Sequence, residues 1–309
     1  MAPAAKPPAS DRSPGPQGRG YSQLLVAPGQ TGPNLVGLYG IVIGVVCYLM
    51  FAGYASQLVL WLYWLIAGDG SFADFRTAAG GFGTPAGMLA GNLAIALLIV
   101  VAALLVRYLH LLPARLLLSV EQRVRWRWFA ISGVLSVVIF AVHVALMPVR
   151  GEDLVWQPQA GFAGFLIVMV LTTPLQAIGE EVFFRGYLLQ ALGTITRSPW
   201  LAIIASALFF AFFHGGQNLA LFLSRFAFGL LGGWLVHRTG GLEAAVGAHV
   251  VNNLFAWTLA GATSSVAEVR AIDQVAWAQA FSDVLLFAII ALVCTAVARR
   301  GRIQRLTSA

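Results

Sequence analysis

Long runs of apolar residues dominate this 309-residue sequence and leave little chain for other structure. A helix needs roughly 20 apolar residues to cross the hydrocarbon core of a bilayer. Strands of a membrane β-barrel would instead alternate in segments of about ten residues. Because the apolar runs are long and unbroken, the sequence predicts an all-α, polytopic membrane protein with about eight transmembrane helices. The predicted spans are 35–66, 86–109, 127–148, 160–192, 199–214, 217–238, 242–262 and 276–298.

The segments outside these spans divide the chain into three parts. Residues 1–34 are rich in proline and glycine and carry no apolar run, so we expect a disordered cytoplasmic tail. The same lack of an apolar run argues against a signal peptide. Residues 35–300 are predicted to form the transmembrane domain, and residues 301–309 a basic C-terminal tail.

The positions of the basic residues predict how the chain crosses the membrane. Arginines gather in the tails and in segment 107–127, whereas the opposite loops hold several acids and only Arg76, Arg150 and Arg270. Basic loops favour the cytoplasm, so both termini are predicted to lie there, in a multi-pass protein of the cell membrane. Segment 112–127 is either an interfacial helix or an ordinary basic loop. Membrane orientation thus explains the net charge of +7, and we expect no nucleic-acid partner.

Charged groups inside a span are costly and therefore mark candidate functional sites. Glu180, Glu181 and Arg185 lie together in the fourth span. Residues four apart share a helix face, so Glu181 is predicted to pair with Arg185. Glu180 is rotated by about 100° from Glu181 and is left for chemistry. The structural alternative is a buried ion network that only fixes helix packing.

Two more spans carry polar groups at helical spacing. His214 ends the fifth span, just before the glycine pair at 215–216, which permits a tight turn. His249 and Asn253 lie four apart on the seventh span and share a face, with Asn252 as a competitor. An imidazole and an amide aimed at one point can stabilise an oxyanion. The alternative is hydrogen bonding between helices.

Together these groups form the parts of a hydrolytic site. Glu180 and His214 can hold and deprotonate a water molecule, while His249 and Asn253 can stabilise the tetrahedral intermediate. A second possibility is a divalent metal such as zinc, held by Glu180, His214 and His249, although the H-E-x-x-H spacing is missing.

The motifs Glu180-Glu181-x-x-x-Arg185, Phe210-x-x-x-His214 and His249-x-x-x-Asn253 occur in order between about 160 and 262. In this the chain resembles the CAAX prenyl protease and bacteriocin-processing family (CPBP, also called Abi). The resemblance implies an eight-helix intramembrane endopeptidase, whose members are named metalloproteases. It implies that Glu180 activates water with His214, that His249 and Asn253 form the oxyanion hole, and that Glu181, Arg185 and Phe210 support the site.

The predicted substrate is a peptide or membrane protein within the lipid bilayer, and the sequence does not specify whether it is prenylated. Two alternatives remain: a non-catalytic protein of the same fold, acting in bacteriocin self-immunity or as a scaffold, and a transporter. A transporter is expected to carry inverted repeats, and no convincing pair is visible.

One conflict arises from the predicted span boundaries. At 1.5 Å per residue, Glu180 lies about 30 Å from the outer start of its span, and His214 lies about 22 Å from the inner start of its own. These depths differ, so the two residues can meet only if a boundary is displaced. Arg225, in the sixth span, is either a counter-charge for Glu180 or Glu181, or a side chain that reaches toward the membrane surface.

Overall fold

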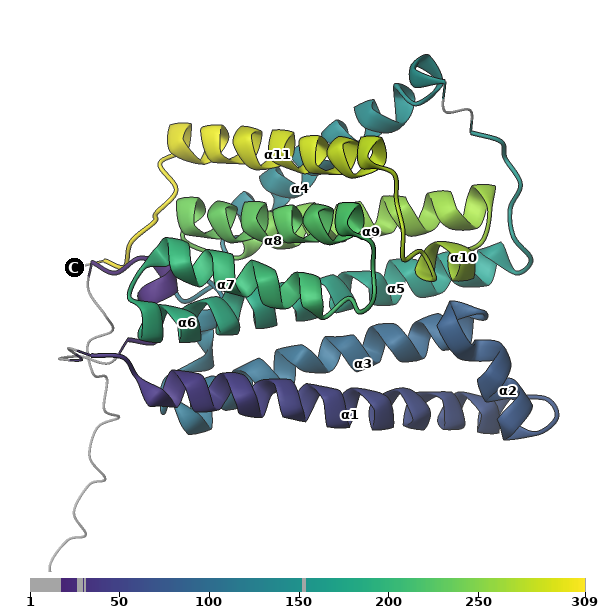
Figure 1. Ribbon diagram of the computed structural model, residues 1–309, viewed down its shortest axis with the longest axis horizontal. Coiled ribbons are helices and arrows are strands. Elements are labelled where there is room, and N and C mark those ends of the chain that lie inside the picture. The colour runs from purple at the N-terminus through teal and green to yellow at the C-terminus, as the bar shows by residue number, and fades with distance from the viewer. Residues whose placement is uncertain (1–17, 27–29, 31, 152–153, 309) are drawn as a thin grey trace, which may run out of the picture.

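The computed structural model describes residues 18–26, 30, 32–151 and 154–308, and over these residues the fold is all-α, as predicted. Figure 1 shows an elongated bundle in which the long helices run roughly side by side. The long helices are α1 (Leu35–Ala67), α3 (Pro85–Leu104), α4 (Trp126–Ala145), α5 (Phe162–Glu180), α7 (Pro199–Phe212), α8 (Leu219–Thr239), α9 (Glu243–Thr263) and α11 (Trp277–Arg300). The shorter helices are α2 (Phe72–Ala79), α6 (Leu189–Thr196) and α10 (Val266–Arg270).

Short 3-10 and π-helical segments join several of these helices. The π-helical segments η3 (Leu105–Leu109) and η6 (Glu181–Leu188) continue α3 and α5. The 3-10 turns are η1 (Tyr21–Gln23), η2 (Gly80–Phe82), η4 (Ala114–Leu117) and η5 (Pro148–Arg150). Segment 112–125 is therefore a loop with one short turn, and Leu116, Leu117 and Val120 hold it in place by burial in the core.

Six helical runs among the described residues are long and apolar enough to cross a membrane. The number predicted, about eight, is thus approximate, because α7 has only 14 residues and α9 carries several polar groups. Large apolar side chains such as Leu49, Ile66 and Val170 are exposed on the outside of the bundle. Such a surface is suited to contact with lipid and not with water. The chain is a multi-pass membrane protein. The six runs are Leu35–Ala67, Pro85–Leu109, Trp126–Ala145, Phe162–Thr196, Leu219–Thr239 and Trp277–Arg300.

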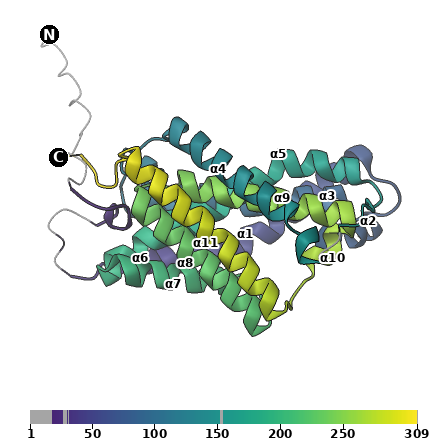
Figure 2. The ribbon, with the colours of Figure 1, turned by 90° about the horizontal axis from the view of Figure 1, so that it is seen from above.

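Helix α9 occupies the interior of the bundle. It packs against α4 and α5 and also touches α8, while α3 lies between α1 and α5, and α7 packs along α8. Figure 2, seen from above, shows α11 and α8 crossing this group obliquely. A polar helix such as α9 can lie at membrane depth because protein, and not lipid, surrounds most of it.

The run from α5 through η6 to α6 resolves the conflict over depth. It continues to Thr196, beyond the predicted end at 192, and α7 then turns back at Pro199. Counted from that turn at 1.5 Å per residue, Glu180 lies about 24 Å away along α6 and His214 lies about 22 Å away along α7. The two residues therefore reach similar depths, and the displaced boundary is the inner end of the fourth span.

Both tails pack against the same end of the bundle, which we call the terminal end. Tyr21, Leu24 and Leu25 are almost fully buried, and Tyr21 donates a hydrogen bond to the Leu117 carbonyl. The backbone N–H of Thr307 donates to the Arg19 carbonyl at 3.0 Å. The prediction of a disordered tail over 1–34 is therefore wrong for residues 18–26, because three large apolar side chains enter the core. Residues 1–17, 27–29 and 31 lie outside the described residues.

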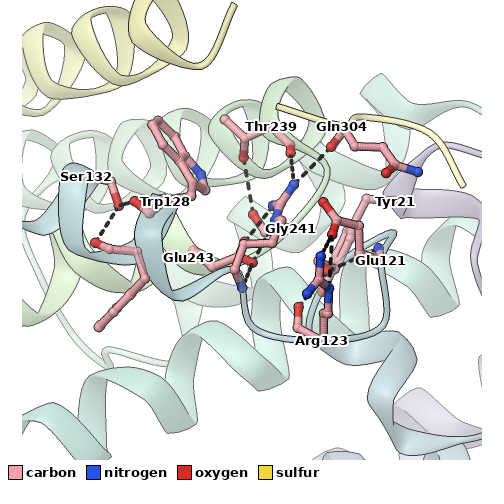
Figure 3. Close-up of polar contacts among 12 residues, drawn as sticks. Tyr21, Glu121, Arg123, Trp128, Ser132, Thr239, Gly241, Glu243 and Gln304 are labelled. Atoms are coloured by element: carbon pink, nitrogen blue, oxygen red, sulfur yellow. Dashed lines mark hydrogen bonds and ion pairs between the residues drawn. The ribbon is translucent and has the colours of Figure 1, made fainter. Parts of the chain in front are cut away.

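A buried ion pair joins several segments at the terminal end, as Figure 3 shows. The Arg125 guanidinium donates to both carboxylate oxygens of Glu243, at 2.8 and 2.6 Å. The same side chain donates to the carbonyls of Thr239 and Gln304, at 2.9 Å each. The start of α4, the end of α8, the start of α9 and the C-terminal segment thus share one network.

Candidate active site

The charged pair of the first motif lies in the π-helical segment η6. Arg185 Nη1 lies 3.1 Å from Glu181 Oε1, and both side chains are only 1% exposed. The pairing predicted from the spacing of four is therefore present. The guanidinium carbon of Arg185 lies 4.0 Å from the centre of the Phe210 ring, which adds a cation–π contact. π-helical segments inside α-helices occur frequently at functional sites.

His249 lies between the two carboxylates of the motif. Its Nδ1 is 2.7 Å from Glu181 Oε1, and its Nε2 is 3.4 Å from Glu180 Oε2. The ring is nearly fully buried and packs edge-on against Phe228, with 4.9 Å between the ring centres. The short contact at Nδ1 fixes the orientation of the imidazole and turns Nε2 toward Glu180.

His214 follows the last turn of α7, where Gly215 takes a left-handed conformation with φ of +80°. The glycine turn predicted at this point is therefore present. Nδ1 of His214 lies 2.7 Å from the Phe210 carbonyl oxygen. Since a carbonyl oxygen only accepts, Nδ1 carries the hydrogen, and in the neutral ring Nε2 is left as an acceptor. The Phe210 ring contacts His214 at 4.6 Å and faces His249 at 6.3 Å, so it lies beside both imidazoles.

Asn253 belongs to a chain of amides that the sequence did not predict. Its Nδ2 donates to Gln176 Oε1 at 2.9 Å, and Asn252 Nδ2 donates to Asn253 Oδ1 at 2.9 Å. Gln176 lies four residues before Glu180, so the same spacing rule that links Glu181 to Arg185 could have indicated it. Asn252 is thus a partner of Asn253.

One cavity of about 380 Å³ brings the four predicted catalytic side chains together: Glu180, His214, His249 and Asn253 line it. The Glu180 side chain is 14% exposed. Arg225 lines the same cavity and donates to Gln217 Oε1 at 2.7 Å. It therefore lies in the wall of the cavity that Glu180 also lines.

The geometry does not fit the metal alternative proposed for Glu180, His214 and His249. Across the described part of the chain, no group of three or more His, Cys, Asp or Glu side chains is placed to hold an ion. The physical reason lies in the imidazoles: both nitrogens of His249 face carboxylates, and His214 Nδ1 faces a carbonyl. In the described residues these three side chains are therefore not arranged as a set of metal ligands.

Fold and site define a class: a polytopic membrane protein with an acid and imidazole cluster in a cavity enclosed by its helices. Residues 162–255 match the type II CAAX prenyl endopeptidase Rce1-like family, and this segment contains all three motifs. Over this segment, about a third of the chain, the protein is similar to the CAAX prenyl protease and bacteriocin-processing family. Its fold is thus CAAX-protease-like, and the family is one of proteases.

A curated relative is similar over a longer segment. The uncharacterized protein YyaK of Bacillus subtilis (strain 168) is 26% identical over 169 residues, which is 49% of this chain and 54% of the relative. The chain thus spans about half the length of the curated relative it matches.

Proposed function

We propose that this protein is an intramembrane endopeptidase that hydrolyses peptide bonds with a water molecule activated by glutamate and histidine. The observation that carries the proposal is the single cavity lined by Glu180, His214, His249 and Asn253. Side chains from three separate helical segments converge there, and packing alone does not require this convergence. The substrate is a peptide or a segment of a membrane protein, and the termini lie in the cytoplasm of a cell-membrane protein.

In this mechanism Glu180 and His214 share the attacking water. The Glu180 carboxylate accepts one proton of the water, and His214 Nε2 is the acceptor nitrogen because Nδ1–H donates to the Phe210 carbonyl. Direct attack by water needs no acyl intermediate. Glu181 and Arg185 neutralise each other beneath the site, so Glu180 keeps its charge available for the water.

His249 and Asn253 stabilise the oxyanion of the tetrahedral intermediate. Because Glu181 holds Nδ1, the Nε2–H of His249 is directed at the cavity. Its distance of 3.4 Å to Glu180 Oε2 is long for a hydrogen bond, so this N–H can donate to the oxyanion instead. Asn253 Nδ2 donates one hydrogen to Gln176 and has a second for the oxyanion. Preorganised donors of this kind contribute about 3 kcal/mol each to lowering a barrier.

The test compares membrane proteomes of a strain lacking the gene, complemented with wild-type protein, Glu180→Gln or Glu268→Gln. Glu268 is an exposed acid on α10, outside the cavity, and serves as the matched control. Wild type and Glu268→Gln should remove the same uncut substrates, whereas Glu180→Gln should leave them. With a purified substrate, losing the general base should slow cleavage by about 10²–10⁴-fold. Cleavage by Glu180→Gln at the wild-type rate would disprove the catalytic assignment.

A further inference from the structure

A second pocket, of about 410 Å³, lies beside the catalytic cavity at the opposite end of the bundle from the tails. Its lining residues come from α1, η2, α3 and the C-terminal ends of α2 and α10, and Figure 1 shows these ends on the side of the bundle away from the C-terminus. Phe82 and Arg270 line both the pocket and the catalytic cavity, so they form a shared wall. Neither the motifs nor the proposed mechanism uses this pocket.

Two cations converge on this pocket. Arg76 lies in the last turn of α2 and Arg270 is the last residue of α10. Both line the pocket, and none of its lining residues is an acid. The Arg270 guanidinium lies 5.5 Å above the Phe82 ring, which holds it at the shared wall. The loops on this side of the membrane carry few basic residues and several acids. The composition of these loops therefore does not account for two arginines in one pocket. A position at a helix C-terminus explains a single cation, but not the convergence of two.

The rest of the lining suits an oxyanion. Ser56 and Gln57 of α1 add polar side chains. Gly80 and Gly81 leave the floor open, since a side-chain atom added at either would meet nothing within 4 Å. A phosphate has room there to approach the backbone and both guanidinium groups.

The depth of the pocket in the membrane indicates whether such a phosphate would belong to a lipid headgroup or be free in solution. Tyr48 lines the catalytic cavity, and Ser56 to Leu60 follow it on α1 by about 12–18 Å at 1.5 Å per residue. Ser56 to Leu60 also lie about 32–38 Å along α1 from its start at Leu35, slightly more than the roughly 30 Å of the hydrocarbon core, which places this pocket at the headgroup level. Trp61 and Trp64 come next on α1, where aromatic side chains of an interface are expected.

We propose that the Arg76–Arg270 pocket binds the phosphodiester of an anionic phospholipid. The lipid headgroup then lies against the wall of the catalytic cavity, with its acyl chains along the exposed apolar face of α1. The proposal concerns binding and is independent of the peptidase activity.

Native mass spectrometry of the purified protein in detergent tests it. The probes are phosphatidylglycerol, which is anionic, and phosphatidylcholine with the same acyl chains, which is zwitterionic. Wild type should retain phosphatidylglycerol preferentially. Each of Arg76→Gln and Arg270→Gln should weaken its binding about fivefold, and the double variant about thirtyfold. Arg150→Gln, on the same side but outside the pocket, should change nothing.

The Arg76→Lys and Arg270→Lys pair keeps both charges and should retain most of the preference, which separates loss of charge from loss of fold. Persistence of the preference in the double glutamine variant would overturn the proposal. Inorganic phosphate at millimolar concentration should not displace the lipid. Full displacement would show a site for free phosphate and would also overturn it.

Discussion

The buried pair of Arg125 and Glu243 offers a direct test of what holds the terminal end together. Replacing Glu243 with alanine removes the acceptors of three hydrogen bonds, two from the guanidinium and one from the Arg125 backbone N–H at 3.0 Å. The guanidinium, on a residue only 9% exposed, then keeps the carbonyls of Thr239 and Gln304. Removing one partner of a buried ion pair costs about 3–5 kcal/mol. Because two acceptors remain, we expect about 3–4 kcal/mol, or two to three powers of ten in the folding equilibrium.

Unfolding of the purified protein in mixed micelles by sodium dodecyl sulfate, followed by tryptophan fluorescence, measures this loss. Glu121→Ala is the matched control, because Glu121 pairs with Arg123 in the same loop at 2.7 Å but the arginine is 74% exposed. An exposed pair contributes less than about 1 kcal/mol. The double variant Arg125→Met, Glu243→Leu should be more stable than Glu243→Ala, since it leaves no unpaired charge. Equal unfolding midpoints for Glu243→Ala and Glu121→Ala would refute this reasoning.

Three further predictions concern other parts of the molecule. A Cβ added at Gly193 would lie 1.9 Å from the Ser22 carbonyl, so Gly193→Ala should displace residues 18–26 and speed tryptic cleavage at Arg19. Gly133→Ala, with open space around it, should leave that rate unchanged. Burial lowers the pKa of His110, just beyond its span, to about 4 from 6.5. The unfolded chain then binds the extra proton first, so stability should fall as the pH drops from 6.5 toward 4, and His110→Gln should flatten that part of the unfolding profile. Peptide cleavage should continue after treatment with a strong chelator, because the side chains of the described residues are not arranged to bind a metal ion. If the chelator abolished cleavage and added zinc restored it, this conclusion would be contradicted.

Much of the helical framework could be predicted because apolar runs and their glycine or proline joints mark helices clearly. The span predicted at 217–238 corresponds to α8, Leu219–Thr239, and the span at 242–262 to α9, Glu243–Thr263. The Glu181–Arg185 pair was predictable for a related reason, since it depends only on the rise and rotation of one helix.

Contacts between helices could not be read from such local rules. Residues 18–26 look too polar to fold alone, and they are ordered only because α6 and η4 offer a surface for Tyr21, Leu24 and Leu25. The placement of His249 between Glu181 and Glu180 depends on how α9 is rotated against α5 and η6, which spacing within one helix does not determine. The sequence therefore indicated which residues line the cavity, but not that His249 Nε2 faces Glu180.

The contact between His249 Nε2 and Glu180 Oε2 affects the proposed chemistry because it determines the net charge of the buried cluster. Arg185 and Glu181 cancel, so the remaining group is Glu180 with His249, whose Nε2 and Oε2 atoms lie 3.4 Å apart. One proton between them makes the pair neutral overall, whether it resides on the imidazole or on the carboxylate, and a low-dielectric site disfavours any other count. Under the proposed mechanism, a proton taken from water by Glu180 can then pass to the leaving amine without leaving net charge among the helices. Glu181 is essential to this exchange because its hold on Nδ1 keeps Nε2 turned toward Glu180. Glu181→Gln should therefore reduce cleavage even though it leaves Glu180 in place.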